Sequence, residues 1–360
     1  MVKKKGEFIM VYVDKYIKET VRVFPEQGRY DFYRFDMNEN PDGLPKDFVD
    51  SVLKEITPEF LAVYPEPDRF LEKYAKFIGV NRENVTATNG SDMGLRYLME
   101  TFGEVGKEVV TVSPTFEMYW VNCCILGYKH VPVKYNNDLT IDVKNIVKAI
   151  NENTRIVVLL NPNNPIGNVY SDEEVRQVID KAKSVGAIVI IDEAYHYFYP
   201  GTFVNKVMQE ENVVVLRTFS KAFSIPALRL GVIIANPKII HYIENAKLTF
   251  DVNSVALLFG ERLLDHPEIL KEIVNEENEA KKYTLRELER HGYNCRDCRG
   301  NYIFVEPKHD AKIVAENLRK EKRVLVHPYG NELLRKYLRV SVGSQKMMKI
   351  FLDAFFEIDE

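Results

Sequence analysis

The sequence predicts an α/β fold: a large domain with a mostly parallel seven-stranded sheet sandwiched by helices, plus a smaller α+β domain. Seven short β-rich segments recur between residues 85 and 235, and several are near-continuous apolar runs, as in strands buried on both faces. Segments with the apolar spacing of amphipathic helices separate them. At 360 residues the chain is longer than one hydrophobic core usually serves, which favours two domains.

Strands and helices alternate along the expected large domain. The clearest helix begins with the capping box Ser171-Asp172-Glu173-Glu174 and ends at Gly186. Strand, helix and strand in this order indicate right-handed crossovers between parallel strands. The expected strands are 85–88, 108–112, 129–133, 155–160, 187–191, 213–217 and 230–235.

The pattern changes after about residue 265. A long charged helical stretch is followed by shorter strands and helices, which is typical of a second, α+β unit that the N-terminal arm joins. We therefore predict a large domain at 46–264 and a smaller one formed by 1–45 and 265–360. Within the smaller domain we expect helices at 267–291, near 311–320 and at the end of the chain, and strands at 302–306, 324–327 and 338–342.

Composition excludes several classes of protein. A net charge of −4 is too small for a general nucleic-acid binder, and no apolar run reaches the roughly 18 residues of a membrane span. The apolar stretch from Phe8 to Val13, which follows Lys3, Lys4 and Lys5, is shorter than the core of a secretory signal. We interpret it as the start of the fold and expect a cytoplasmic protein.

The four cysteines allow two interpretations. The Cys295-x-x-Cys298 spacing is compatible with a metal or redox site, but Cys123 and Cys124 are adjacent and do not supply a second pair of that spacing. Ordinary reduced thiols are the favoured interpretation, and no metal is expected.

Four polar sequences stand where expected strands end. Ligands of open α/β sheets bind beyond the carboxyl ends of the strands, so these sequences should meet at one rim. Their convergence favours chemistry over coincidence. The four are Thr88-Asn89-Gly90-Ser91-Asp92, Asn161-Pro162-Asn163-Asn164-Pro165-Ile166-Gly167, Asp192-Glu193-Ala194-Tyr195 and Ser220-Lys221-Ala222-Phe223.

Lys221 is the candidate nucleophile. We expect it at the start of a helix, where its positive charge is unfavourable beside the helix dipole. A bound phosphate would reverse this effect. Ser220 and Arg229 would donate hydrogen bonds to that phosphate, and the lysine would form a Schiff base with an aldehyde. Taken alone, a surface lysine at a helix start is the simpler interpretation.

A second phosphate cradle is expected at the start of the helix that follows the strand 85–88. The backbone amides of Gly90, Ser91 and Asp92 would be free in its first turn, and such amides bind phosphate readily. The simpler interpretation is that Ser91 or Asp92 caps the helix.

Asp192 directly follows a buried strand, where a carboxylate is unfavourable unless it is paired. The protonated nitrogen of a bound pyridine ring is a suitable partner for this carboxylate. Tyr195 and Asn164 could then form hydrogen bonds with a phenolic oxygen on the same ring. Phe116 could stack on that ring, and Arg339 could bind a carboxylate or phosphate through its planar fork of donors. Each has a simpler interpretation: a turn carboxylate, a core aromatic and a solvated arginine.

Taken together, the order of the motifs resembles the class I/II aminotransferases of the aspartate aminotransferase fold, which depend on pyridoxal 5′-phosphate (PLP). The histidinol-phosphate aminotransferase branch is the most similar, over about residues 36–345. The motifs are Asn38-Glu39-Asn40-Pro41-x-Gly43, Tyr64-Pro65-x-Pro67, Asn89-Gly90-Ser91-Asp92, Pro162-Asn163-Asn164-Pro165-x-Gly167, Asp192-Glu193-Ala194-Tyr195, Ser220-Lys221-Ala222-Phe223, Leu228-Arg229-x-Gly231, Asn301-Tyr302 and Arg339-Val340-Ser341-Val342-Gly343.

The resemblance implies a role for each candidate. Lys221 would carry PLP and shuttle the proton, Asp192 would hold the pyridinium, and Phe116 would stack on the ring. Tyr195 and Asn164 would contact the phenolic oxygen. The phosphate would be bound by Gly90, Ser91, Asp92, Ser220 and Arg229.

The resemblance also implies a homodimer. Tyr64 would reach the cofactor and substrate of the neighbouring subunit. Arg339 would bind the anionic group of the substrate, with Asn164 beside it.

Two departures from the family pattern concern the substrate. His327 stands where the family usually has a second arginine, and we expect its charge to change with pH near neutrality. The usual N-terminal Tyr-x-Pro-Gly segment is replaced by Val23-Phe24-Pro25-Glu26-Gln27-Gly28-Arg29-Tyr30. Both regions line the family's substrate pocket.

Three functions remain open on sequence grounds. The leading one is an aminotransferase that moves an amino group between an amino acid, with glutamate as the expected donor, and a small phosphorylated or carboxylated partner. A decarboxylase of a phosphorylated amino acid would use the same cofactor residues. A catalytically silent PLP-binding regulator is disfavoured, since such proteins usually carry an attached DNA-binding domain and strands begin here by residue 85.

Overall fold

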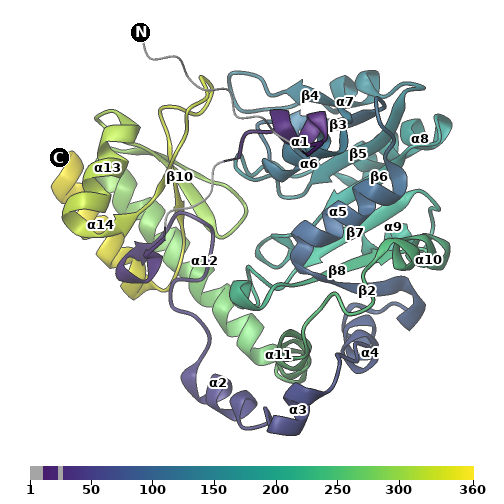
Figure 1. Ribbon diagram of the computed structural model, residues 1–360. Helices are drawn as coiled ribbons and strands as arrows, with labels where there is room; N and C mark the ends of the chain where they lie inside the picture. Colours follow the sequence, from purple (N-terminus) through teal and green to yellow (C-terminus); the bar gives the residue numbers. More distant parts are fainter. Residues whose placement is uncertain (1–10, 23–26) are drawn as a thin grey trace.

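A computed structural model describes residues 11–22 and 27–360 and shows two separate main sheets (Figure 1). Residues 1–10 lie outside the described part of the chain; they include Lys3, Lys4, Lys5 and the beginning of the stretch from Phe8 to Val13. Residues 23–26, in the N-terminal segment that differs from the family pattern, also lie outside it.

The larger sheet has seven strands in the order β2-β8-β7-β6-β5-β3-β4. Only β8 runs antiparallel to its neighbours, so the predicted mostly parallel sheet is confirmed. Each predicted strand matches to within a residue or so, because continuous β-branched runs leave little ambiguity. The strands are β2 (Val85–Asn89), β3 (Glu108–Ser113), β4 (Lys129–Lys134), β5 (Thr154–Leu160), β6 (Ile188–Asp192), β7 (Val213–Thr218) and β8 (Leu230–Ala235).

Helices cover both faces of this sheet (Figure 1). On one face α5 (Gly90–Phe102) contacts α6 (Met118–Leu126) and α10 (Pro237–Ala246), and the short α1 (Lys15–Glu19) contacts α6. On the other face lie α7 (Val143–Ala149), α8 (Asp172–Ser184) and α9 (Val204–Val207). The predicted capping box at the start of α8 is present, with Ser171 and Glu174 each accepting from the other's backbone amide.

The second sheet has the order β12-β13-β10-β9, and the helices α12 (Pro267–Arg290), α13 (Ala311–Lys322) and α14 (Gln345–Asp359) pack around it. Its strands are β9 (Asn294–Asp297), β10 (Tyr302–Glu306), β12 (His327–Pro328) and β13 (Leu338–Ser341). The prediction missed β9, since its polar residues carry no strand-like pattern. In the N-terminal arm, β1 (Tyr33–Arg34) pairs in parallel with β11 (Val324–Leu325). The domain boundaries at 45/46 and 264/265 stay a prediction.

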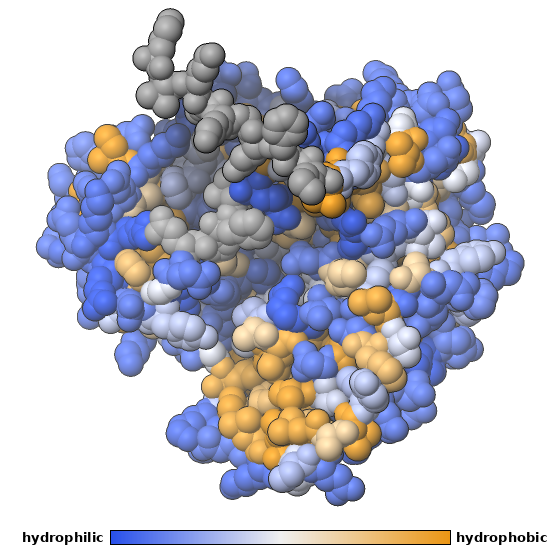
Figure 2. Space-filling model, in the orientation of Figure 1, coloured by the Kyte–Doolittle hydropathy of each residue, from blue (hydrophilic) through white to orange (hydrophobic). Residues whose placement is uncertain are grey.

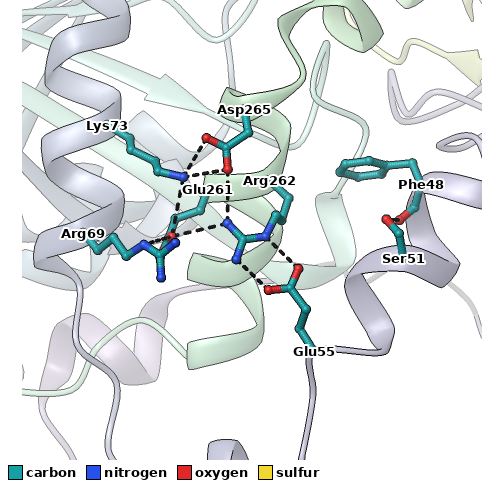
Figure 3. Close-up of polar contacts among 8 residues, drawn as sticks. All are labelled: Phe48, Ser51, Glu55, Arg69, Lys73, Glu261, Arg262 and Asp265. Atoms are coloured by element: carbon teal, nitrogen blue, oxygen red, sulfur yellow. Dashed lines mark hydrogen bonds and ion pairs between the residues drawn. The ribbon is translucent and has the colours of Figure 1, made fainter.

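A group of ion pairs ties α11 (Ser254–Asp265) both to α4 (Asp68–Ile78) and to the segment that carries α2 (Lys46–Leu53) and α3 (Pro58–Ala62). Arg262 of α11 binds Glu55, between α2 and α3, through two hydrogen bonds of 2.7 and 2.6 Å (Figure 3). Lys73 of α4 binds Asp265 at 2.6 Å, and Arg69 binds Glu261 at 2.9 Å. These contacts fix the segment that leads to Tyr64.

The link between β7 and β8 corrects one prediction. Lys221 does not open a helix. Because β8 runs antiparallel to β7, the chain must turn back at once and has no crossover helix. It does so through turns and the single 3-10 turn Pro226–Leu228, with Ser224 and Arg229 at positive φ. Across the described residues, no helix is long and apolar enough to cross a membrane.

Candidate active site

The carboxyl ends of β2, β5, β6 and β7 lie at the same edge of the large sheet, because these four strands run in the same direction. The strand β8 begins at that edge, immediately after Arg229. The four polar sequences therefore meet at one rim, as predicted.

Lys221 lies half-buried at this rim, and its Nζ donates to the carbonyl oxygen of Met37 at 2.8 Å. Burial, followed by the charge of Arg339, lowers the pKa of Lys221 to about 8, although the carboxylates of Glu39 and Asp92 oppose this. The unfavourable field comes from burial and neighbouring arginines, not from a helix dipole. A lysine of this pKa has a substantial neutral, nucleophilic fraction near neutral pH.

An anion cradle lies beside Lys221, at the start of α5. No side chain caps this helix, whose first residues are Gly90, Ser91 and Asp92. The two guanidinium nitrogens of Arg229 reach Asp92 Oδ2 at 3.0 Å and Ser220 Oγ at 3.4 Å. Backbone amides at a helix start, a hydroxyl and an arginine together form a suitable phosphate site.

Two glycines allow these elements to approach one another. A Cβ on Gly90 would come within 2.9 Å of Cζ of Arg229, and Gly90 has a φ of +71°. A Cβ on Gly231 would come within 2.5 Å of the backbone nitrogen of Ser91. A side chain at either position would push the arginine or the helix start out of place.

Asp192 ends β6 and is only 4% exposed. It accepts hydrogen bonds from the hydroxyl of Tyr119 at 2.7 Å and the amide of Ala194 at 3.0 Å. Burial raises the pKa of Asp192 to about 6, against the effect of these hydrogen bonds. Both of these partners are neutral, and no ion pair of Asp192 is found among the described residues, so the carboxylate is suited to bind a cationic group.

Tyr195, Asn164 and Arg339 lie together next to these groups. The buried hydroxyl of Tyr195 accepts from Asn38 Nδ2 at 2.9 Å, which leaves its own proton to donate. Arg339 Nη1 donates to Asn164 Oδ1 at 2.7 Å, and Nη2 donates to the carbonyl of Asp36 at 2.6 Å. The buried Nε of Arg339 has no partner.

His327 lies directly opposite Arg339 in the β12–β13 pair. His327 keeps an exposed surface, while partial desolvation, followed by the charge of Arg339, lowers its pKa to about 4. This direction argues against a change of charge near neutrality in the unliganded protein, and the role of His327 in the substrate pocket stays a prediction.

Phe116 and Tyr64 differ in their placement. Phe116 is half-buried and packs edge-on against Tyr119 at 5.7 Å between ring centroids, within the group around Asp192. Tyr64 is 72% exposed and stacks on Phe250 at 4.2 Å between centroids. The described contacts do not bring Tyr64 to the rim of its own chain.

Sequence reasoning missed several residues of the site. Tyr119 gave no signal beyond its position three residues after Phe116. Asn38 was seen only as part of a motif, without a role. Glu193 and Arg217 form a fully buried ion pair at 2.8 Å that ties the end of β6 to β7. Glu193 belongs to a motif that was noted in the sequence, but its pairing with Arg217 depends on the order of the strands in the sheet.

The cysteines lie outside this arrangement. All four thiols are free, and burial raises the pKa of Cys298 to about 12 and that of Cys295 to about 11. Among the residues that the structure describes, no group of three or more His, Cys, Asp or Glu side chains could hold a metal ion.

The site defines a class of enzyme. A buried carboxylate lacks a cation, a helix start with Ser220 and Arg229 is suited to a phosphate, and a lysine of lowered pKa lies at the same rim. PLP has a basic pyridine nitrogen, an aldehyde and a phosphate, so the residues fit this cofactor.

Comparisons with known proteins agree with this class. The family model described as "Aminotransferase class I and II" matches residues 30–355. Histidinol-phosphate aminotransferase of Thermoanaerobacter sp. strain X514 is 32% identical over 340 residues, which cover 92% of this chain and 95% of the relative. The chain belongs to the class I and II aminotransferase family and is a PLP-dependent transaminase, so the predicted family and enzyme class are confirmed.

Solved structures show the same fold. Histidinol-phosphate aminotransferase from Sinorhizobium meliloti, in complex with pyridoxal-5′-phosphate, has a TM-score of 0.87 at 20% identity and covers 96% of this chain and 97% of its own. L-threonine-O-3-phosphate decarboxylase from Porphyromonas gingivalis has a TM-score of 0.76 at 20% identity and covers 90% of this chain and 98% of its own. At these identities the likeness concerns the fold alone.

The raised pKa of Asp192 predicts a pH-dependent stability of the cofactor-free protein. Above pH 6 a buried ionised carboxylate destabilises the fold, and protonation relieves this as the pH falls. Cofactor-free Asp192→Asn should therefore exceed wild type in free energy of unfolding at pH 8 by up to about 3 kcal/mol, with the difference vanishing near pH 4.

Urea denaturation at a series of pH values measures this difference. The exposed Asp353→Asn is the matched control and should show no such dependence. Equal stability of wild type and Asp192→Asn across pH 4–8 would contradict the buried, unpaired state of Asp192.

Proposed function

We propose that this transaminase passes an amino group between an amino acid, with glutamate as the donor, and a small phosphorylated or carboxylated partner. The convergence of Lys221, Asp192 and Arg229 at one rim carries the proposal. The relatives that are at least 30% identical are described as histidinol-phosphate aminotransferases.

The proposed roles follow from the geometry. When bound, PLP supplies an electron-withdrawing ring that stabilises negative charge at the substrate's Cα. Asp192 would hold the ring nitrogen protonated, and Tyr195 would donate to the phenolic oxygen, with Asn164 beside it. Lys221 would anchor the aldehyde carbon, and its amine would accept and return the proton at the substrate's Cα.

The other contacts position the cofactor. The amides of Gly90, Ser91 and Asp92, the hydroxyl of Ser220 and the guanidinium of Arg229 bind the phosphate. Arg229 now pairs with Asp92 at 3.0 Å, and the phosphate would compete for that arginine. Phe116 covers one face of the ring.

We assign the anionic group of the substrate to Arg339, whose buried Nε lacks a partner and whose neighbour across the strand pair is His327. A neutral imidazole adds no charge to this pocket. Two further arginines of the N-terminal arm lie nearby but are already paired: Arg29 with Asp36 and Glu39, and Arg34 with Glu39. Of these three arginines, only Arg339 is outside an ion pair, so a dianionic phosphate would meet one such arginine here.

This pocket predicts a substrate preference. Histidinol phosphate should be a poor substrate compared with a smaller anionic amine or amino acid.

Arg339→Ala should raise KM for the amino donor at least tenfold, because a charge-assisted hydrogen bond contributes roughly 1.5–3 kcal/mol. His327→Arg should improve kcat/KM for phosphate-bearing substrates selectively.

Steady-state assays with a panel of amino acids, following keto acid and carbon dioxide separately, test both substrate and reaction. Keto acid without carbon dioxide supports transamination. Carbon dioxide from a phosphorylated amino acid would instead favour the decarboxylase. Efficient turnover of histidinol phosphate by the unmodified enzyme would contradict the assignment of His327.

We also propose a homodimer in which Tyr64 completes the neighbouring subunit's site. Figure 2 shows an apolar area on the lower part of the molecule, where Figure 1 has α2, α3 and α11. A contiguous exposed apolar surface commonly marks an interface. The exposed apolar side chains of this part of the chain include Leu53, Leu61 and Val63, and, just before α11, Leu248 and Phe250, on which Tyr64 stacks. The ion pairs of Glu55 with Arg262 hold this segment in place.

A mixed-dimer experiment tests the composite site. Tyr64→Phe and Lys221→Ala subunits, each nearly inactive alone, should form mixed dimers with one intact site, because Lys221 of one subunit meets Tyr64 of the other. Co-expression with two affinity tags isolates these dimers. Their activity should approach half that of wild type.

Exchange with Lys221→Ala subunits that also carry Tyr64→Phe is the matched control and should recover nothing. Mixed dimers without activity, or an active monomer in sedimentation, would contradict the proposal.

For the cellular compartment we propose the cytoplasm, which the four free thiols support.

A further inference from the structure

Tyr119, in the first turn of α6, is a buried residue to which the proposed function gives no role. It is 1% exposed, and its hydroxyl donates to Oδ2 of Asp192 at 2.7 Å. Its ring packs edge-on against Phe116, with 5.7 Å between the ring centroids. Tyr119 therefore connects the residue that we propose to cover the cofactor ring with the carboxylate that we propose to bind the ring nitrogen.

The hydroxyl of Tyr119 must be the donor when Asp192 is ionised, since a carboxylate has no proton to give. The other carboxylate oxygen, Oδ1, accepts from the backbone amide of Ala194 at 3.0 Å. These two bonds fix the plane of the carboxylate and leave a lone pair on each oxygen for a further donor. A donor that binds the charged form of an acid stabilises that form, so it makes the carboxylate a weaker base.

The sheet around Asp192 supplies no charge that would compensate for its burial. The residues beside it on the two neighbouring strands are Leu160 of β5 and Leu216 of β7. The side chain that donates to the carboxylate therefore comes from outside the sheet, from α6. Tyr119 is placed to control the proton affinity of Asp192 without adding a charge.

The titratable groups that face this carboxylate favour its protonation. After burial, the charges of Asp92 and Glu193 raise the pKa of Asp192 further, although each is itself paired with an arginine, at 3.0 and 2.8 Å. Burial also raises the pKa of Tyr195 to about 12 and that of Tyr119 well above its usual value. Both phenols thus keep their protons at neutral pH, and Tyr119 is a permanent donor there.

We propose that Tyr119 is a positioning residue that keeps the proton shared by Asp192 and the cofactor's ring nitrogen on the nitrogen. This inference rests on the proposed function of Asp192. A buried carboxylate and a pyridine nitrogen that face each other compete for one proton, and the hydrogen bond from Tyr119 weakens the carboxylate in this competition. Without the hydroxyl, Asp192 would take the proton and the pair would become neutral, which weakens the withdrawal of electrons from the substrate.

The effect on Asp192 is tested on the cofactor-free protein, so this test does not depend on the proposed function. An ionised Asp192 destabilises the folded protein increasingly as the pH rises from about 3.9, the usual pKa of an unfolded aspartate, to its folded pKa of about 6. In urea denaturation, the difference in free energy of unfolding between Asp192→Asn and wild type should therefore level off near pH 6.

In a Tyr119→Phe background the same difference should continue to rise to about pH 7 or above. The reason is that the carboxylate loses a donor to its charged form, which raises its proton affinity at least about tenfold. Phenylalanine keeps the ring that packs on Phe116 and removes only the hydroxyl. A difference that still levels off near pH 6 would overturn the proposal.

The position of the proton is tested on the holoenzyme by nitrogen-15 NMR with a cofactor labelled at the ring nitrogen, because protonated and neutral pyridine nitrogens have well-separated chemical shifts. Wild type should give the shift of the protonated nitrogen, and Tyr119→Phe should move it toward that of the neutral one. The value of kcat should fall at least about tenfold with little change in KM, since the hydroxyl contacts Asp192 and not the substrate.

Tyr128→Phe is the matched control: Tyr128 follows α6, and its hydroxyl donates to the carbonyl oxygen of Met99 at 3.0 Å. It should change neither the pH dependence of stability nor the NMR shift. A protonated nitrogen in Tyr119→Phe, or equal shifts in both variants, would overturn the proposal. If Asp192→Asn also leaves the nitrogen shift unchanged, then the proposed role of Asp192 has failed, and the cofactor-free measurement decides by itself whether Tyr119 sets the proton affinity of Asp192.

Discussion

The rest of the site depends on a buried carboxylate at the end of β6. A parallel sheet brings the carboxyl ends of its strands to one edge, so a charged residue placed there is desolvated by strands on both sides. Asp192 is 4% exposed and is not matched by a described cation. Under the proposed function, a cationic ring bound at this point would relieve the unfavourable burial of Asp192, and its electron-withdrawing effect would be strengthened there.

The neighbouring residues hold Asp192 in that position. Glu193 accepts from Arg217, from the hydroxyl of Thr202 and from the amide of Phe203, which locks the end of β6 against β7 and the loop beyond it. Such a buried pair adds little net stability, but breaking it would leave an uncompensated charge. Its effect is geometric: it joins the end of β6, where Asp192 lies, to β7, three residues before Lys221.

Much of the fold and the site could be predicted from the sequence. The seven strands of the large sheet were predicted correctly, because their apolar runs are bounded by clear turn residues. Lys221 and Asp192 could be proposed as site residues because each would be unfavourable alone, and Arg229 because it could donate to a phosphate beside Lys221. The helix at Lys221 was wrong, since only the pairing of β8 with β7 shows that the chain must turn back there. The position of His327 opposite Arg339, whose charge lowers the histidine's pKa, could not be predicted, because a sequence does not show which residues face each other across a strand pair. The burial of Glu277 in α12, where it is 3% exposed, could not be predicted, because the helix has a charged sequence typical of a solvent-exposed one and only tertiary packing buries this residue.

The central claim is that Lys221 is the residue to which the cofactor attaches, at the rim where Asp192 and Arg229 meet. The most direct measurement is borohydride reduction of the holoenzyme, followed by proteolysis and mass spectrometry of the peptides. The account predicts a single pyridoxyl-modified residue, Lys221, and no modification of the Lys221→Ala protein. Modification of another lysine in wild type, with Lys221 unmodified, would contradict it.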